Sequence, residues 1–176
     1  MNSFTISRTF NAPRNQVFSC WTTPDRFENW FAPDECETKL IHADATPGGH
    51  FLQSDKWPDG SHFFIKHVYR QVEAEERIAF VTSFCNENGE IVRHPHAALW
   101  PEKILTTANF DQDGAGTKVT VVLEPIEAST EEIAFFTQIR ESCLKGWSGT
   151  FDRLERVIRT LAPHSSDDSS NPDKSR

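Results

Sequence analysis

The amino-acid sequence predicts an α+β protein with the helix-grip fold, in which a curved antiparallel sheet wraps around a long C-terminal helix and two short helices follow the first strand. Three observations support this architecture. Residues 4–33 are typical of one strand and two short helices, residues 37–124 contain six strand-like runs, and residues 130–161 have the periodicity of a long amphipathic helix. A long helix across one curved sheet can enclose a cavity, so a ligand pocket is the first functional hypothesis.

The N-terminal segment begins with alternating side chains over residues 4–10, which predicts a strand. Asn11 is expected to cap the helix that follows, and Pro13 suits a first helical turn. Pro24 is expected to begin a second short helix, and Pro33 to end it, because the residue before a proline is disfavoured in the helical conformation. This segment is therefore predicted to fold as strand, helix, helix.

Six further strands are predicted in the middle of the chain, from short runs of apolar and β-branched residues between turn signals. They are residues 37–43, 50–55, 61–72, 77–84, 103–111 and 117–124. The glycines of residues 47–49 predict a tight turn, and residues 113–116 predict a hairpin. Residues 91–101 contain two prolines and two histidines, and are expected to form a loop or a ragged edge strand.

One long helix is predicted over residues 130–161. Ser129 and Glu132 have the spacing of a capping box, in which each side chain satisfies a backbone amide of the other. Apolar and small residues then recur every three or four positions and are expected to face the sheet: Phe136, Ile139, Cys143, Trp147, Thr150, Leu154, Val157 and Leu161. Such a helix spans roughly 48 Å at about 1.5 Å per residue, enough to cross a whole sheet.

The composition sets the domain organisation and excludes several partners. A chain of 176 residues with 37% hydrophobic residues is expected to form one domain, residues 3–161, with a disordered polar tail, residues 162–176. The net charge of −8 argues against nucleic acid and against anionic membrane surfaces as partners. No apolar run is long enough to span a bilayer, and the N-terminus lacks a signal-peptide core, so a cytoplasmic location is expected.

Metal binding and thiol chemistry have weak support in the sequence. His94 and His96 are the closest histidine pair, but Pro95 separates them and no third ligand stands at a diagnostic spacing, so we expect no metal and no other cofactor. The four cysteines are far apart and are expected to be buried small hydrophobes. A reactive thiol is the alternative, and Cys143 on the long helix is its best candidate.

His67 and Trp147 are the two residues for which a functional role is weighed against a structural one. His67 alternates with Phe63, Ile65 and Tyr69 along a predicted strand, so it shares their face and could anchor a ligand or act as a base. The same face could equally be ordinary core. Trp147 lies between two helical glycines, which suggest either helix flexibility or the close approach of a backbone or a ligand.

Several segments together resemble the family related to the C-terminal domain of the activator of heat-shock protein 90 ATPase. They are Arg8-x-Phe10-x-Ala12-Pro13, Val17-Phe18-x-x-Trp21-Thr22-x-Pro24, Trp30-Phe31-x-Pro33, Asp44-x-x-Pro47-Gly48-Gly49-x-Phe51, Glu75-Glu76-Arg77-Ile78-x-Phe80 and Gly146-Trp147-x-x-x-Phe151-x-x-Leu154. This resemblance implies membership of the START-like, or SRPBCC, superfamily, whose members include lipid carriers, hormone receptors and polyketide cyclases. Two departures from the family pattern are His67, near a position that often holds glycine, and the segment around Pro95.

Three functions follow from the resemblance and the pattern of side chains. The leading hypothesis is a small apolar or amphipathic ligand bound between helix and sheet by Phe51, Phe63, Ile65, His67, Tyr69, Phe80, Ile139, Cys143 and Trp147. The second is a co-chaperone-like module whose partner is a chaperone or a second copy of this chain. The third is a cyclase or hydrolase that uses His67 or Tyr69, although no catalytic signature identifies a catalytic residue.

Overall fold

The computed structural model describes residues 2–161, which form one seven-stranded sheet and four helices. The strands are β1 (Phe4–Phe10), β2 (Glu37–Ala43), β3 (His50–Lys56), β4 (His62–Glu73), β5 (Arg77–Cys85), β6 (Ile104–Asp113) and β7 (Gly116–Pro125). The helices are α1 (Arg14–Thr22), α2 (Pro24–Phe27), α3 (Thr130–Gln138) and α4 (Arg140–Leu161). The predicted tail, residues 162–176, lies outside the described residues.

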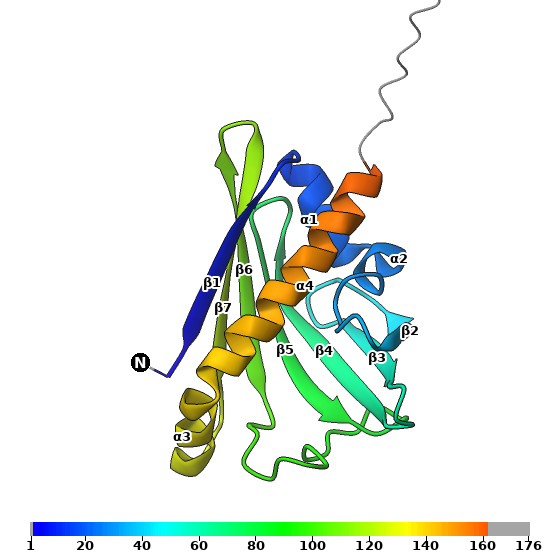
Figure 1. Cartoon of the computed structure of the whole chain (residues 1–176), viewed down its shortest axis with the longest axis vertical. Helices are drawn as coiled ribbons and strands as arrows, with labels where there is room; N and C mark the ends of the chain where they lie inside the picture. The colour runs from blue at the N-terminus through cyan, green and yellow to red at the C-terminus, as the bar shows by residue number, and fades with distance from the viewer. Residues whose placement is uncertain (1, 162–176) are drawn as a thin grey trace, which may run out of the picture.

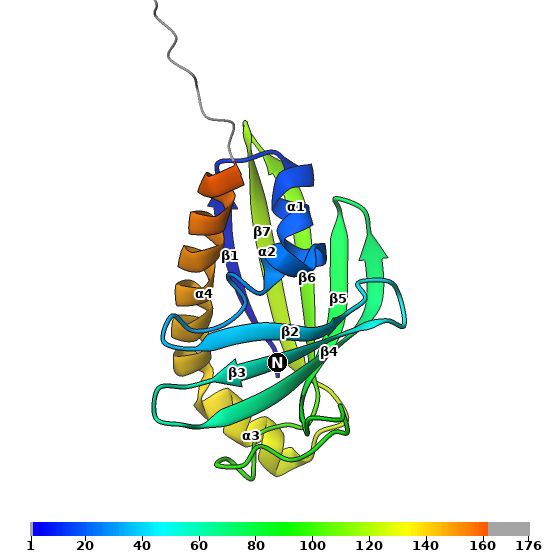
Figure 2. The ribbon, with the colours of Figure 1, turned by 90° about the vertical axis from the view of Figure 1, so that its right-hand side faces the viewer.

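The sheet is antiparallel throughout and has the strand order β1-β7-β6-β5-β4-β3-β2. The six strands predicted in the middle of the chain are all present, with ends within two residues of the predicted ones. The register shifts between Leu40 and His42 on β2 and between Tyr69 and Gln71 on β4, and such bulges bend a strand and increase its twist. The sheet curves around α4, which crosses its concave face (Figures 1 and 2). The predicted helix-grip architecture is therefore confirmed.

The prediction of one unbroken helix over residues 130–161 is wrong. The chain leaves helical geometry at Ile139, with φ −89° and ψ 8°, and α3 turns away from the axis of α4 (Figure 2). Two contacts lie beside the break. The Thr137 hydroxyl donates to the Ile133 carbonyl at 2.9 Å, a bond that bends helices, and the Phe136 ring stacks on Phe4 at 4.6 Å and holds α3 to the edge strand.

The helix starts agree with the sequence in two of three places. Ser129 and Glu132 form the predicted capping box at α3, with bonds of 3.2 and 2.7 Å, and Pro24 occupies the first turn of α2. Asn11, however, does not cap α1. Pro13 is the N-cap residue instead, because its carbonyl accepts from the amides of Gln16 and Val17 and its own backbone is extended.

Residues 91–101 form the predicted loop, and their only ladder contact within the described chain is a single bridge between Ile91 and Cys85. Arg93 in this loop forms an ion pair with Glu132 at the start of α3. This ion pair connects the loop to α3. Trp100, near the end of the loop, packs against the edge of the core. None of the helices in residues 2–161 combines the length and the apolar character needed to cross a bilayer.

The core is aromatic and lies between the concave face of the sheet and the helices. Trp21 and Trp30 are fully buried, with ring centroids 4.7 Å apart, and the Trp30 indole donates to the Cys20 carbonyl at 2.9 Å. The Tyr69 hydroxyl, on β4, donates to the Trp21 carbonyl at 3.0 Å. These contacts fasten α1 and α2 over one end of the sheet, and α4 covers the space beside them.

Candidate functional site

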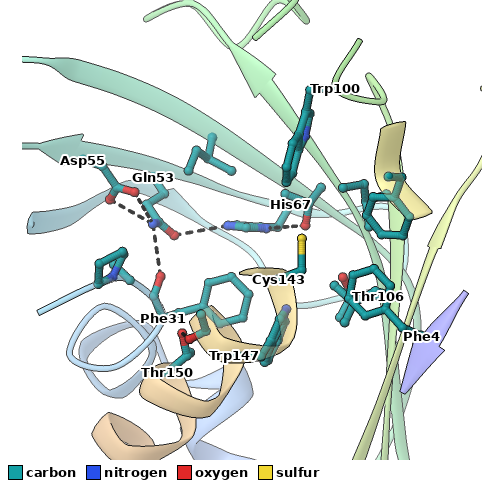
Figure 3. Close-up of a pocket in the computed structure, with 18 residues that line it drawn as sticks. Phe4, Phe31, Gln53, Asp55, His67, Trp100, Thr106, Cys143, Trp147 and Thr150 are labelled. Atoms are coloured by element: carbon teal, nitrogen blue, oxygen red, sulfur yellow. Dashed lines mark hydrogen bonds between the residues drawn. The ribbon is translucent and has the colours of Figure 1, made fainter. Parts of the chain in front are cut away.

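A cavity of about 330 Å³ lies between α4 and the concave face of the sheet (Figure 3). Its walls come from both edges of the fold, from the loop before β2 and from the loop after β5. They are formed by Phe4, Phe31, Ala32, Pro33, Gln53, Asp55, Ile65, His67, Thr82, Trp100, Ile104, Thr106, Leu123, Phe136, Cys143, Gly146, Trp147 and Thr150. The volume falls at the lower end of the range of about 300–1,000 Å³ that is usual for ligand pockets.

Periodicity explains how each element contributes to the wall. On the strands, alternate residues face inward, such as Gln53 and Asp55 on β3 and Ile65 and His67 on β4. On α4 the lining residues recur at three- and four-residue steps from Cys143. Two of the wall residues, Pro33 and Gly146, are exposed to solvent. The cavity therefore opens between the loop before β2 and the middle of α4.

The glycines on either side of Trp147 do not mark a close approach of protein backbone. A Cβ added at Gly146 or Gly149 would meet no atom of the described chain within 4 Å. That part of the sequence-based expectation is wrong. Gly146 lines the cavity and is exposed, so it leaves this part of the rim without a side chain.

A chain of hydrogen-bonded side chains forms the polar end of the cavity (Figure 3). His67 is buried, with Nδ1 3.0 Å from the Thr82 hydroxyl and Nε2 3.1 Å from Oε1 of Gln53. The Gln53 amide nitrogen donates at 2.9 Å to both carboxylate oxygens of Asp55 and at 3.2 Å to the carbonyl of Phe31. The Thr38 hydroxyl completes the chain by donating to Asp55 at 2.9 Å.

The network fixes the charge and the tautomer of His67. Burial lowers the pKa of this imidazole to about 3, so the ring is neutral at neutral pH. Because both amide hydrogens of Gln53 are donated elsewhere, its oxygen faces the ring and accepts from Nε2–H. Nδ1 is then the acceptor, and the Thr82 hydroxyl donates to it. Both nitrogens are engaged by the protein, which suits a structural anchor better than a general base.

Asp55 is the only acidic residue that the described chain places on the cavity wall, and it is 4% exposed. Burial raises the pKa of this carboxyl above its ordinary value of 3.8, and the hydrogen bonds from Gln53, Thr38 and Cys36 and the charge of Arg153 offset only part of that increase. The carboxylate therefore lies at the end of an otherwise largely apolar cavity.

Four of the nine predicted site residues line the cavity: Ile65, His67, Cys143 and Trp147. The other five lie elsewhere: Phe51, Phe63, Tyr69, Phe80 and Ile139. A ligand-binding role for any of the nine remains a prediction.

The length of β4 explains why only some of its inward-facing residues line the cavity. The strand rises about 3.3 Å per residue, so Phe63 and Tyr69 are roughly 20 Å apart and too distant to face one cavity. Phe63 packs at one end against Phe84, with ring centroids 6.2 Å apart, and the helices α1 and α2 cover Tyr69 at the other end. Only the positions between these residues are left to face the cavity.

Of the three remaining residues, Phe51 and Phe80 belong to the core. Phe51 packs edge-to-face on Phe27 at 5.0 Å, and Phe80 packs on Phe31 at 5.8 Å. Ile139 is half-buried at the break between α3 and α4. None of the three lines the cavity.

Sequence reasoning missed the polar partners of His67. Gln53 and Asp55 alternate with Phe51 on one strand, and this period of two was enough to place them on the inward face. Thr82 could have been found only from the pairing of His67 with Thr82 across β4 and β5. The expectation that the second short helix runs to Pro33 is wrong, because α2 ends at Phe27, and Phe31 therefore reaches the wall from the loop before β2. Trp100 reaches it from the loop after β5, for which the sequence carries no periodic signal.

The other candidate chemistries gain no support from the geometry. Within residues 2–161, no group of three or more histidine, cysteine or acidic side chains is arranged to hold a metal ion. The His94 and His96 rings are 6.3 Å apart in the loop after β5. Cys143 lines the cavity, but burial raises the pKa of its thiol and so disfavours the nucleophilic thiolate.

Trp147 is expected to contribute to stability and to the shape of the cavity. Its half-buried indole stacks on Trp21 at 6.3 Å and meets Phe31 and Phe151 edge-on, at 5.6 and 5.7 Å. Trp147→Ala should enlarge the cavity and lower the free energy of unfolding by about 2 kcal/mol, less than for a fully buried ring. Trp147→Phe should keep most of the stability. Urea denaturation of both variants measures the difference, and equal losses would contradict this assignment.

A comparison with family sequence models gives one match over most of the chain. The model described as "Activator of Hsp90 ATPase homolog 1-like protein" matches residues 11–159. None of the curated proteins matches the chain.

Solved bacterial structures share the fold. A protein from Staphylococcus epidermidis superposes with a TM-score of 0.75 at 25% identity, over 93% of each chain. One from Arthrobacter aurescens gives 0.74 at 20% identity, over 93% of this chain and 91% of that one. One from Mycobacterium smegmatis gives 0.72 at 19% identity, over 88% and 89%.

Proposed function

We propose that this chain, which belongs to the family of Activator of Hsp90 ATPase homolog 1-like proteins and has the START-like fold, binds a small apolar or amphipathic molecule in the cavity between α4 and the sheet. The observation that carries the proposal is the cavity itself. It is open to solvent at Pro33 and Gly146, and its walls are mostly aromatic and aliphatic side chains. Burial of an apolar ligand against such walls is favourable by about 25 cal/mol per Å².

The polar end supports a ligand with one polar group. His67, Gln53 and Asp55 are held by one another and by backbone, so their positions do not depend on a ligand. A preformed set of this kind orients a ligand without the entropy cost of ordering side chains on binding. The apolar body of the ligand would lie along Phe31 and Trp147, with its polar end toward β3.

Two other functions have less support. The description of the family names an activator of Hsp90 ATPase, which is compatible with a protein-interaction module, but no described surface of this chain identifies a protein partner. The cyclase or hydrolase hypothesis assigned the chemistry to His67 or Tyr69. Both nitrogens of His67 are hydrogen-bonded to side chains of the protein, and the Tyr69 hydroxyl donates to the Trp21 carbonyl outside the cavity, so neither residue offers a free base there.

The neutral dye N-phenyl-1-naphthylamine tests the proposal, because its fluorescence rises when it enters an apolar site. We expect the wild-type protein to bind one molecule of dye. Cys143→Trp places an indole in the cavity and should weaken dye binding at least about tenfold, because the dye would lose wall area that it buries in the wild type. Fluorescence titration gives the dissociation constants.

Ser142→Trp is the matched control. Ser142 is the neighbouring residue on α4, is exposed and does not line the cavity, so its variant should bind the dye as the wild type does. Circular dichroism of both variants checks that they fold. An absence of dye binding to the wild type, or equal weakening in both variants, would contradict a cavity-bound ligand.

A further inference from the structure

We infer that the cavity selects a ligand with a positively charged nitrogen on an apolar body, such as an aromatic or alkyl amine, and that Asp55 is the group that recognises the cation. This inference rests on the proposed function, since it assumes that the cavity holds a ligand. It adds the charge and the hydrogen-bonding character of that ligand, which neither the family nor the fold specifies.

The charge of the wall is the first argument. Among the described residues that line the cavity there is one carboxylate, Asp55, and no lysine or arginine. A ligand carboxylate, such as that of a fatty acid, would meet a like charge in a site of low dielectric, which is unfavourable. A cation would instead meet an opposite charge that folding has already removed from water, so only its own desolvation opposes binding.

Hydrogen-bond accounting is the second argument. Within the polar chain, the hydrogens of Thr82, His67, Gln53 and Thr38 are all donated to other members of the chain or to the Phe31 carbonyl. The hydrogen-bonding sites of this chain that remain for a ligand are therefore acceptors. A carboxylate offers about four lone-pair sites, and within the described chain Asp55 accepts from three donors: the Gln53 amide, which both carboxylate oxygens share, the Thr38 hydroxyl and the Cys36 thiol. The end of the cavity can accept a hydrogen bond from a ligand, and an ammonium group is the strongest donor for this purpose.

The groups around Asp55 leave its charge available. Thr38 and Cys36 approach from the β2 side, Gln53 from β3 and Arg153 from α4. Arg153 carries the only positive charge among them, and it is engaged by Asp34 at 3.4 Å and by the Ala32 carbonyl. It does not line the cavity. Arg153 attracts the Asp55 carboxylate and lowers its pKa, but its charge is shared with the Asp34 carboxylate.

The aromatic walls fit the same ligand class. Phe31 and Trp147 meet edge-to-face at 5.6 Å, and both line the cavity. Aromatic faces attract cations and the polarised C–H groups beside them, by about 0.5–1 kcal/mol at exposed sites and more when water is excluded. The cavity therefore offers an organic cation a carboxylate at its polar end and aromatic rings along the rest of its wall.

Three probes of the same shape test the inference on the unmodified protein. They are 3-phenylpropylamine, 3-phenylpropan-1-ol and 3-phenylpropanoate, and each is titrated against protein loaded with N-phenyl-1-naphthylamine at pH 7. We expect the amine to displace the dye at a concentration about tenfold or more below that of the alcohol. Both probes can donate a hydrogen bond to the carboxylate, but only the ammonium adds an attraction between opposite charges. The carboxylate should be the weakest of the three.

Asp55→Asn keeps the shape of the side chain and removes its charge. In this variant the amine should lose its advantage over the alcohol, whereas alcohol binding should change less than threefold. Glu37→Gln is the matched control, because it makes the same change in net charge at an exposed residue outside the cavity. It should leave the order of the three probes unaltered.

A pH titration gives an independent measurement. Burial raises the pKa of Asp55 above its ordinary value of 3.8, so amine affinity should fall as the pH is lowered through that raised pKa, while alcohol affinity stays constant. Binding of the alcohol or the carboxylate as tightly as the amine would overturn the inference and leave the proposed function standing, as would equal loss of amine and alcohol in Asp55→Asn. A wild-type protein that binds the dye but none of the probes would also overturn it. Failure to bind even the neutral dye would overturn the proposed function itself.

Discussion

Replacement of Trp21 by alanine is expected to lower the free energy of unfolding by about 3–5 kcal/mol, the range for a large buried aromatic residue. The side chain is fully buried at the junction of α1, the sheet and α4. Its ring lies within 4.7–6.5 Å, centroid to centroid, of five aromatic neighbours. They are Trp30, Phe31, Phe80, Phe110 and Trp147. Because two of these residues also line the cavity, the loss of Trp21 should loosen its wall.

Urea denaturation followed by circular dichroism measures the effect. Trp57→Ala is the matched control, since Trp57 is only partly buried, in the turn between β3 and β4. Its removal should cost about 1 kcal/mol or less. Trp21→Phe should be milder than Trp21→Ala, because it keeps a ring and removes an indole N–H that is buried without an acceptor in the described chain. Similar losses for Trp21→Ala and Trp57→Ala would show that Trp21 is not a central core residue.

Lowering the pH from 7 to 4 is expected to destabilise the fold by about 3 kcal/mol through His67 alone. Burial lowers the pKa of this imidazole from 6.5 to about 3 in the folded protein. Between these two values the unfolded chain binds a proton at this position and the folded chain does not. Stability therefore falls as the pH falls through that window, by about 1.4 kcal/mol per pH unit below 6.5.

The comparison with His67→Gln isolates this contribution, because glutamine does not titrate and the other acidic groups are unchanged. Asp55, whose pKa is raised, acts in the opposite direction and gains stability as the pH falls. The wild type should lose more stability than the variant between pH 7 and pH 4. If the variant does not fold, NMR of the wild-type imidazole provides the test: His67 should stay neutral at pH 5. A protonated ring there would contradict the buried network.

Local sequence patterns were enough to predict most of the elements. The alternation of side chains along residues 4–10 predicts β1, and the turn at residues 113–116 predicts the hairpin of β6 and β7. Both are local signals, because side-chain direction in a strand alternates from one residue to the next. The capping box of Ser129 and Glu132 likewise closes within one turn of helix. The inward position of His67 was predictable for the same reason, since Ile65 faces the same side of β4.

What the sequence could not decide is which neighbour covers each inward-facing residue. Ile65 and Tyr69 lie on the same face of β4, yet Ile65 lines the cavity whereas Tyr69 is covered by α1. The periodicity of the sequence also does not predict the helix break at Ile139 or the position of Trp100 on the cavity wall. The amino-acid sequence by itself determined the strands, the starts of α2 and α3 and the inward face of Ile65 and His67, because these depend on hydrogen bonds and steric contacts between residues close in the chain. Only the tertiary structure decided where that face is core and where it is cavity, because this depends on where helices distant in sequence come to rest and on how much of a curved sheet they can cover.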